Sequence, residues 1–439
     1  MPRGRAGADA LAQRAIQVNR HRAEAALHLA AARPRLLAVG FNHHGRSQTL
    51  PRPYPAPALV TETAALAALC ARLREEPFVT IDTEFMRERT YYPELCVVQL
   101  GGAHENAVID AQAAGLDLAP LGALLRDEGT LKVFHAARQD VEIFLELFGA
   151  VPAPLFDTQV AAMVAGFGDQ VGYDALVAAL TGGQIDKAHR FSDWSARPLS
   201  PAQVSYAAAD VTHLHTAYLR LRERLERDGR AGWVAEEMQA LARPETYRAD
   251  PEAMWERLRP RTSNRRLLGV LRAAAAWRER EAQRVDIPRQ RLVRDEGLLE
   301  IAATAPGDAE ALARCRGITR GFAEGRSGAG LLAAIAAAKA LPEDALPDAP
   351  RARDTPRASP ALVSLLKVLL AAKCEEHDVA PKLVASSDDI DRLATEPEPE
   401  IPALAGWRRQ VFGEDALALK AGRVALGVAG KRVKLIQAA

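Results

Sequence analysis

The sequence predicts an α/β domain followed by one or two small helical domains. Short β-rich segments lie within residues 78–136, whereas the chain beyond residue 263 carries almost only helical patterns. Strands first and helices later, with a strand–helix crossover among them, are typical of an α/β domain. The length of 439 residues also exceeds the roughly 250–300 residues at which single cores stop growing. Two or three domains are therefore expected.

The α/β domain is expected over residues 58–230. Three β-rich segments follow one another early in this range and suggest a meander. A fourth precedes an amphipathic helix, which provides the crossover. In order, the predicted strands are 78–85, 96–100, 106–110 and 131–136, and the main predicted helices are 63–77, 138–148 and 201–228.

The segment before this domain differs in composition. Residues 1–57 hold nine arginines against two acidic residues and end in a proline-rich run, so we expect a basic, poorly folded extension. It could be an accessory tail or reflect a start codon that really lies near Val60. A transit peptide is a further reading, but no second targeting feature supports it.

The chain after the α/β domain is predicted to be helical in two blocks. We expect a connector over residues 231–262, a helical domain over 263–341, a linker over 342–358 and a second, degenerate helical domain over 359–439. The linker is dense in proline, aspartate and arginine. The interruption EPEPEIP weakens the prediction of a compact second domain.

Composition excludes several classes of protein. No apolar run approaches the roughly 20 residues of a membrane span, so no membrane association is expected. The four cysteines are scattered without CxxC spacing, which argues against a zinc site or a disulfide framework and suits a reducing cytoplasm. The net charge of +1 decides nothing, because an acidic cleft and basic surfaces could cancel in the sum.

Three separate segments carry acidic residues that could converge. Asp82 and Glu84 in FVTIDTEF project from the same face of one strand. Asp140 opens the helix after the strand LKVFHA, and Tyr206 and Asp210, four residues apart, share a helix face. Each feature alone has a plainer explanation: solvated acids on a strand, a first-turn acid favoured by the helix dipole, and a helix-surface contact.

The joint order of these features is the stronger signal. Four carboxylates from three distant segments could bind two divalent ions, and hard oxygen ligands suit Mg²⁺ or Mn²⁺. Two such ions about 3.5–4 Å apart can activate an attacking water and stabilise the departing oxygen in phosphodiester cleavage. The sequence therefore favours a two-metal site that cleaves phosphodiesters.

Three longer segments carry a family resemblance. IDTEFMRERTYYPELCVVQL, VFHAARQDVEIF and SDWSARPLSPAQVSYAAADVTHL resemble the exonuclease motifs of the ribonuclease D family, over roughly residues 59–230. The resemblance implies a ribonuclease H-like mixed sheet flanked by helices, and a DEDD-type 3′→5′ exoribonuclease of the tyrosine subgroup. The metal ligands that it implies are Asp82, Glu84, Asp140 and Asp210.

The same resemblance implies a substrate and a role for the tyrosine. The substrate would be RNA with a single-stranded 3′ end, most of all tRNA precursors, and the products would be nucleoside 5′-monophosphates. Tyr206 would orient the attacking water or assist its deprotonation. Since an ordinary tyrosine pKa of about 10 makes a poor base at neutral pH, we favour orientation.

Four residues next to these motifs are candidates for substrate binding. Phe85, Met86 and His135 adjoin the motif acids and could contact the terminal bases or sugar. Core packing explains Phe85 and Met86 at least equally well. Arg197 could contact a phosphate or brace the helix that carries the motif tyrosine, whereas bracing is favoured for Trp194.

The C-terminal half resembles a second kind of module. The stretch from Arg265 through RCRGITR is similar to the HRDC domain, which implies an auxiliary nucleic-acid binder, and residues 359–439 match it more weakly. The many arginines could contact phosphates, but interleaved acids are also usual on a solvated helix face.

Two alternative functions stay open. One is a 3′→5′ DNA exonuclease, because a metal site of this kind does not by itself inspect the 2′-OH. The other is a catalytically silent RNA-binding protein, against which the presence of all four acids argues. No obligate protein partner is implied.

Overall fold

The computed structural model describes residues 56–348 and 358–437, which divide into two compact units. Of these residues, 56–85 and 95–247 form the first unit, and 86–94 and 248–437 form the second. The basic extension expected over residues 1–57 lies almost wholly outside the described residues, as does most of the linker expected over 342–358. No helix of the described ranges is long and apolar enough to cross a membrane.

A six-stranded mixed sheet forms the centre of the first unit. Its order is β1-β4-β3-β2-β5-β6. β1 pairs with β4, β2 with β5 and β5 with β6 in parallel, whereas β3 and β4 are antiparallel. The strands are β1 (Ala58–Val60), β2 (Phe78–Met86), β3 (Glu94–Gly101), β4 (Asn106–Asp110), β5 (Leu131–Phe134) and β6 (Leu155–Asp157). The four predicted strands are present, and β2, β3 and β4 are neighbours as the meander requires.

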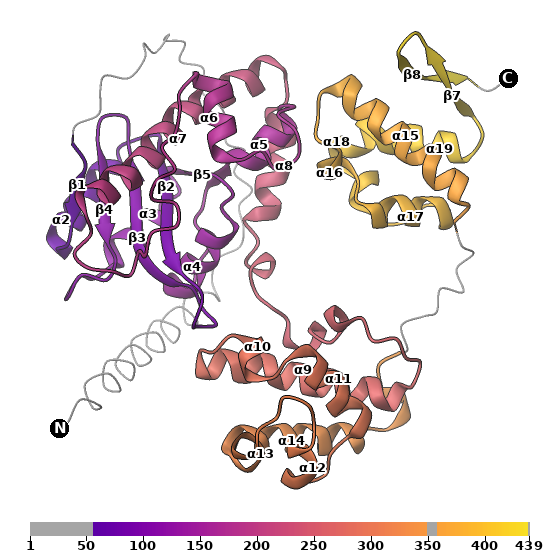
Figure 1. Cartoon of the computed structure of the whole chain (residues 1–439). Coiled ribbons are helices and arrows are strands. Elements are labelled where there is room, and N and C mark those ends of the chain that lie inside the picture. The colour runs from indigo at the N-terminus through magenta and orange to yellow at the C-terminus, as the bar shows by residue number, and fades with distance from the viewer. Residues whose placement is uncertain (1–55, 349–357, 438–439) are drawn as a thin grey trace. The chain divides into compact units, whose positions relative to one another are not determined.

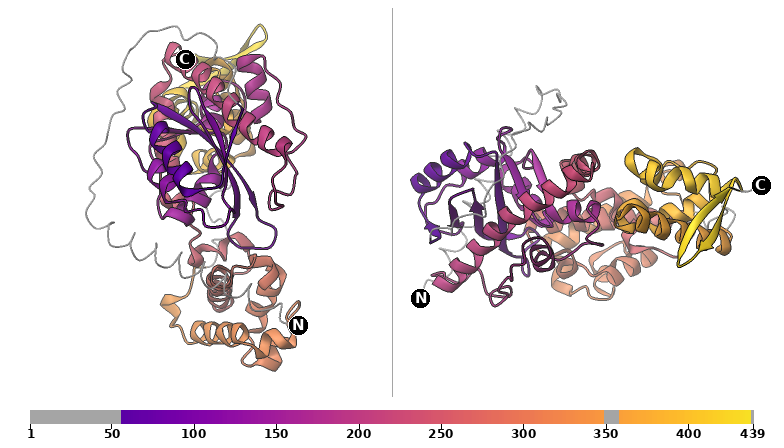
Figure 2. Two further views of the ribbon diagram at one scale, coloured as in Figure 1. Left: turned by 90° about the vertical axis from the view of Figure 1, so that its left-hand side faces the viewer. Right: turned by 90° about the horizontal axis from the view of Figure 1, so that it is seen from above.

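Helices cover both faces of this sheet. The longest helix, α7, crosses one face and contacts β4 and β5 (Figure 1), and the turned view shows the sheet between helices on its two sides (Figure 2). The helices of the unit are α2 (Thr63–Leu73), α3 (Ala119–Leu125), α4 (Arg138–Phe148), α5 (Thr158–Val164), α6 (Tyr173–Thr181), α7 (Pro201–Arg227), α8 (Ala231–Leu241) and the 3₁₀ turn η1 (Pro244–Thr246).

The start of α7 is encoded locally. Ser200 is the N-cap, and its hydroxyl accepts a hydrogen bond from the backbone N–H of Gln203. The Gln203 side chain bonds back to the backbone N–H of Ser200, which completes a capping box. Pro201 at the first helical position has a backbone angle suited to helix entry. These signals fix the residue at which α7 begins, and with it the positions of Tyr206 and Asp210 along the helix.

A close approach fixes α7 against the sheet. The hydroxyl of Thr80 on β2 donates to the carbonyl oxygen of Val211 at 2.8 Å. Gly101 at the end of β3 lies beneath the same point, where a Cβ atom would come within 2.5 Å of the Thr80 Oγ1. Since Val211 follows Asp210 in the helix, this contact sets the height of Asp210 above the strand that carries Asp82.

The boundary of the first unit includes a helix in the stretch expected as a connector. α8 packs on α5 and β6, with Val234 and Met238 buried. The connector expected over 231–262 thus begins with an ordered helix of the first unit, and the division between the units falls between Tyr247 and Arg248.

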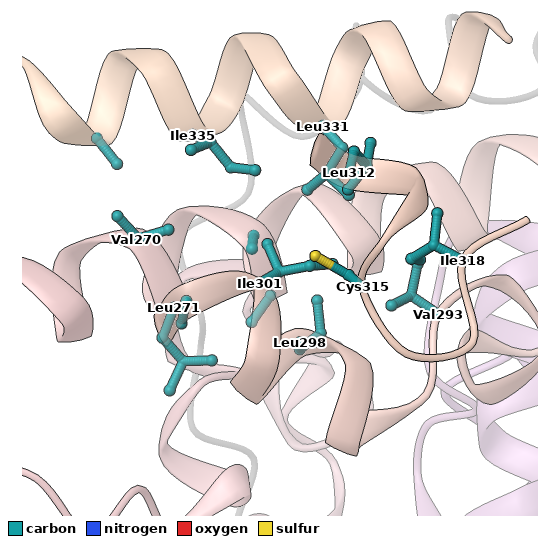
Figure 3. Packing of buried hydrophobic residues seen from close by; sticks show 14 of the residues in the cluster. Val270, Leu271, Val293, Leu298, Ile301, Leu312, Cys315, Ile318, Leu331 and Ile335 are labelled. Carbon is teal, nitrogen blue, oxygen red and sulfur yellow. The ribbon is translucent and has the colours of Figure 1, made fainter. Parts of the chain in front are cut away.

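The first helical region of the second unit packs around one apolar core. Leu331 and Ile335 of α14 point toward Ile301, Leu298 and Leu312 (Figure 3). Its elements are η2 (Pro251–Ala253), η3 (Glu256–Leu258), α9 (Arg265–Val285), α10 (Arg289–Leu292), α11 (Asp295–Thr304), α12 (Ala309–Ala313), α13 (Arg320–Glu324), α14 (Arg326–Lys339) and η4 (Glu343–Ala345). Ile287 and Pro288 follow the end of α9 and separate it from α10.

The last region is helical and ends in a β-hairpin. Its elements are α15 (Pro360–His377), α16 (Pro381–Val384), α17 (Ser387–Thr395), η5 (Pro402–Leu404), α18 (Gly406–Arg408), the π-helical turn η6 (Arg409–Gly413), α19 (Glu414–Lys420), β7 (Val424–Ala429) and β8 (Arg432–Gln437).

This hairpin corrects the expectation of an all-helical second domain. β7 and β8 pair antiparallel, joined by Gly430 and Lys431. Gly430 has a φ of 64°, which glycine adopts without strain and which suits a two-residue hairpin turn. The alternating residues of RVKLIQ, next to this glycine, were the local signal.

Candidate active site

Three carboxylates from two elements meet on one face of the sheet. Asp82 and Glu84 lie on the same side of β2, as their spacing predicts, and Asp210 reaches them from α7. One carboxylate oxygen of each lies within 4.8 Å of the others. Asp210 is buried, whereas Asp82 and Glu84 are partly exposed, so the group is open to solvent on one side.

The fourth predicted acid joins this group from α4. Asp140 lies in the first turn of α4 and is 6% exposed. Its carboxylate accepts a hydrogen bond from the hydroxyl of Thr83 on β2, the charge of Asp82 acts on it, and its own charge acts on Glu84. Asp82, Glu84, Asp140 and Asp210 are called the acid cluster below.

The acid cluster has no cationic side chain as a partner in the described part of the chain. Among the described residues, none of its four members forms an ion pair with lysine, arginine or histidine. Burial, followed by the charges of Asp82, Asp210 and Asp140, raises the pKa of Glu84 to about 9. Burial also raises the pKa of each of the other three carboxyls. Without a cation, the cluster therefore holds protons that ordinary carboxyls would have lost at neutral pH.

The donor set fits a divalent metal ion. Carboxylate oxygens are preferred ligands of Mg²⁺ and Mn²⁺. The spread of 4.8 Å between the oxygens is close to the roughly 4.2 Å that separates opposite ligands around octahedral Mg²⁺. The cluster can therefore hold divalent cations, and such cations would replace the protons.

Tyr206 stands at the open edge of the cluster, one turn before Asp210 on α7. Its ring contacts the rings of His189 and Trp194, with centroid distances of 6.0 Å and 6.1 Å. Burial, followed by the charges of Asp210 and Glu84, raises its pKa above the ordinary value. The phenol consequently keeps its proton, which makes Tyr206 a hydrogen-bond donor rather than a base.

Arg197 has the geometry of a brace. Its Nε and Nη2 donate to the carboxylate of Asp110 at 2.9 and 2.7 Å. Its Nη1 donates to the carbonyl oxygen of Trp194 at 2.6 Å, and Nη2 also donates to that of Cys96 at 2.9 Å. The guanidinium thereby ties the segment before α7 to β3 and β4, and this favours bracing over contact with a phosphate.

The other predicted substrate-binding residues have different settings. Phe85 and Met86 end β2 and are partly exposed. A hydrogen bond fixes the ring of His135. Its Nδ1 lies 3.0 Å from the Thr158 hydroxyl, which itself donates to the carbonyl oxygen of Phe134. Burial lowers the pKa of His135, so its ring is neutral at pH 7.

Sequence reasoning did not find two residues that position the acids. The hydroxyl of Tyr173 donates to the backbone carbonyl of Asp210, and its ring lies 5.2 Å from that of His135. The hydroxyl of Thr83 donates to the carboxylate of Asp140. Both contacts join segments far apart in the chain, and only a buried threonine between two acids offered a local signal.

Comparisons with known proteins agree with this geometry. Residues 57–226 match a family of 3′-5′ exonucleases, and residues 268–335 match the HRDC domain. Ribonuclease D of Gluconacetobacter diazotrophicus is 70% identical over 88% of this chain and 98% of its own length. Ribonuclease D of Acidiphilium cryptum is 64% identical over 87% of this chain and 98% of its own length.

A solved structure extends this likeness to three dimensions. The structure of Escherichia coli RNase D, described as an exoribonuclease involved in structured RNA processing, superposes with a TM-score of 0.72 at 33% identity. It covers 83% of this chain and 99% of its own. The expected mixed-sheet exonuclease domain and HRDC-type helical domain are thereby confirmed. With relatives this similar over nearly their whole length, the chain belongs to the ribonuclease D family of 3′→5′ exoribonucleases.

Proposed function

We propose that this protein removes nucleotides from the 3′ end of structured RNA, with tRNA precursors as its main substrate and two divalent ions, Mg²⁺ or Mn²⁺, as cofactors. The observation that carries the proposal is the acid cluster, in which three carboxylates lie within 4.8 Å of one another and the charge of the fourth acts on Glu84, with no cationic partner in residues 56–348 and 358–437. A cluster built in this way favours a ligand that brings positive charge.

The residues divide the work between holding and orienting. Asp82, Glu84, Asp140 and Asp210 would hold the ions, which when bound activate a water and neutralise charge on the leaving 3′ oxygen. Tyr206 keeps its proton, so its hydroxyl donates a hydrogen bond that orients the attacking water or the scissile phosphate. Tyr173 and Thr83 hold Asp210 and Asp140 in place. The products are nucleoside 5′-monophosphates.

RNA is favoured over DNA by the family, not by the acid cluster. A carboxylate site does not read the 2′-OH, but the Escherichia coli neighbour is described as acting in structured RNA processing. The HRDC domain at residues 268–335 supports this, because an auxiliary helical module could hold the folded part of the RNA. The four cysteines are buried and form no disulfide, which agrees with action in the reducing cytoplasm.

The test is digestion of a 5′-labelled tRNA precursor with a 3′ extension, beside a DNA of matched sequence, with Mg²⁺ or Mn²⁺. We expect stepwise shortening of the RNA from its 3′ end and nucleoside 5′-monophosphates as products. Asp82→Asn should abolish the shortening while leaving the fold intact. If DNA is cut as well as RNA, the repair-type exonuclease is the better assignment, and if neither polymer is cut with either metal, a silent RNA-binding role replaces catalysis.

Tyr206→Phe separates orientation from proton abstraction. The variant lacks only the hydroxyl, so a loss of activity with an unchanged pH profile supports orientation. A profile whose alkaline limb disappears would instead assign Tyr206 to proton transfer.

A further inference from the structure

One short segment beside the acid cluster has side chains that the proposed mechanism does not use. Residues 186–193 connect α6 to the segment that precedes α7. The segment is folded back on itself, since the backbone N–H of Ser192 donates to the carbonyl oxygen of His189 at 3.0 Å. Lys187 ties it to α6 through the carboxylate of Asp174 at 2.6 Å. Its tip is therefore held in place.

The tip presents an aromatic ring to solvent. Phe191 is 92% exposed, the highest value of any large apolar side chain in the described part of the chain, and it is the only aromatic among those exposed side chains. Leaving a phenyl ring in water has a cost in free energy that a purely structural role does not explain. A ring so placed, in a segment that Lys187 ties to α6, is suited to stack on a flat ligand.

The same tip carries a cation. The guanidinium of Arg190 lies 5.5 Å from the centre of the Phe191 ring. Within the described ranges no carboxylate forms an ion pair with Arg190, in contrast to the fully engaged Arg197. Its positive charge is nevertheless close enough to the active site to oppose the rise in the pKa of Tyr206.

The position of the tip relates it to the reaction centre. His189, the residue before Arg190, places its ring edge against Tyr206 at a centroid distance of 6.0 Å. Tyr206 in turn lies one turn from Asp210 of the acid cluster. Arg190 and Phe191 therefore follow directly on a residue whose ring contacts the tyrosine beside the acid cluster.

We propose that Arg190 and Phe191 form a binding site for the single-stranded 3′ end of the RNA, in which Phe191 stacks on a base and Arg190 binds a neighbouring phosphate. The inference rests on the proposed function for the identity of its ligand. Stacking on an aromatic ring accepts any base, and a guanidinium recognises a phosphate in any sequence. Such a site would retain the 3′ end after each nucleotide is released without restricting the sequence that is degraded.

The first test measures RNA binding without hydrolysis. In the full chain carrying Asp82→Asn, Phe191→Ala should weaken binding of a single-stranded RNA by about tenfold, within the range for loss of one base–aromatic stack. Phe191→Trp should restore it. Val428→Ala is the control, because Val428 is 81% exposed in the C-terminal hairpin and should leave binding unchanged.

The second test locates the stacked base. An abasic ribonucleotide is placed at each of the last few positions of the RNA in turn. At one position the missing base should weaken binding to the parent protein by about tenfold and should have no further effect in the Phe191→Ala variant. Equal binding by parent and variant, or the same abasic penalty in both, would overturn the role of Phe191.

The third test concerns the phosphate. Arg190→Ala should reduce the slope of log affinity against log salt by about 0.7, the value for one contact with single-stranded nucleic acid. Arg72→Ala is the matched control, since Arg72 is exposed and paired with Glu105 in the same unit. An equal change in slope for both variants would mean that Arg190 contributes only to the general field.

Kinetics with the active protein distinguish this site from mere support of Tyr206. Phe191→Ala should raise KM about tenfold with little change in kcat, and the Trp variant should recover. A fall in kcat at unchanged KM would assign Phe191 to structural support instead. Failure of the parent protein to shorten RNA would refute the proposed function, while the binding measurements would still decide the fate of this site.

Discussion

The two units contain partly or fully buried glutamates in opposite settings. In the first unit, Glu84 lies among like charges with no cation partner among the described residues. In the second, Glu279 and Glu281 on α9 are buried, but Arg289 lies 2.7 Å from Glu279, and Arg284 lies 2.7 Å from Glu281. Glu279 and Glu281 thus each have a cation partner of their own, whereas Glu84 has none among the described residues.

The difference is visible in the pKa of each carboxyl. Hydrogen bonding to Arg284 lowers the pKa of Glu281 to about 2, and burial among other acids raises that of Glu84 to about 9. A buried acid with its own cation contributes to the fold. A buried acid without one destabilises the fold until a ligand supplies the charge, which is the usual arrangement of a metal or catalytic site. The comparison therefore separates structural acids from functional ones within a single chain.

The largest expected effect is on activity when Glu84 is neutralised. Glu84→Gln replaces a carboxyl by an amide of nearly the same shape, which keeps the packing but weakens metal binding. We expect kcat to fall roughly a thousandfold, or about 4 kcal/mol of transition-state stabilisation. The measurement is single-turnover digestion of labelled RNA at saturating Mn²⁺.

Stability provides the control for this variant. Because the metal-free protein already holds Glu84 largely protonated at pH 7, Gln should leave the melting temperature in chelator unchanged or slightly raised. A clear loss of stability in chelator would show that the Glu84 carboxylate is structural, and the contrast between the two units would fail.

Divalent ions should stabilise the first unit in a pH-dependent way. A carboxyl whose pKa rises from 4.5 to about 9 on folding binds its proton more tightly in the native state. In chelator, stability should therefore fall as the pH rises between about 4.5 and 9. A bound cation removes this penalty, and at about a hundredfold excess over Kd it adds about 2.7 kcal/mol by mass action.

The measurement is thermal unfolding with Mn²⁺ or chelator at several pH values. The gain from Mn²⁺ should be larger at pH 8.5 than at pH 6, since fewer protons compete with the ion. Glu84→Gln should reduce the gain, and Glu281→Gln should leave it unchanged. A gain of the same size in the Glu84 variant would place the ion elsewhere.

The fold was largely predictable where local patterns are strong. The β-branched and aromatic residues of β2 indicate a strand, and the capping signals of α7 indicate the start of a helix, each from a few consecutive residues. By contrast, β1 and β6 have three residues each, which is too short for an alternation to register. They exist because the neighbouring strands β4 and β5 offer backbone partners, a tertiary cause that a single segment does not contain.

The candidate site was predictable in the same uneven way. Strand parity placed Asp82 and Glu84 on one face, and helix periodicity placed Tyr206 beside Asp210. The partner of Tyr173 is a backbone carbonyl 37 residues away, and nothing in its neighbours indicates this. For Arg197 the sequence left two roles open, and the bond to Asp110, 87 residues away, favours bracing. The roles of Tyr173 and Arg197 depend on contacts between distant segments, which local spacing in the sequence does not predict.

The smallest expected effect concerns the self-neutralised acids of the helical unit. Glu281→Gln removes the charge that binds Arg284, while the amide oxygen can still accept from the Ser327 hydroxyl. Since Arg284 is half exposed and its charge is screened, we expect the free energy of unfolding to fall by only about 1 kcal/mol at pH 7.

The pKa of Glu281 is lowered on folding from 4.5 to about 2, so its contribution is present above about pH 4.5 and is lost as the pH falls toward 2. Denaturant unfolding should accordingly show a difference between parent and variant at pH 7 that narrows at pH 3. The kcat of this variant on a short single-stranded RNA should not change, because a carboxylate that already has a cation partner takes no part in holding the metal. A loss of kcat comparable to that of Glu84→Gln would remove the distinction between the two kinds of acid.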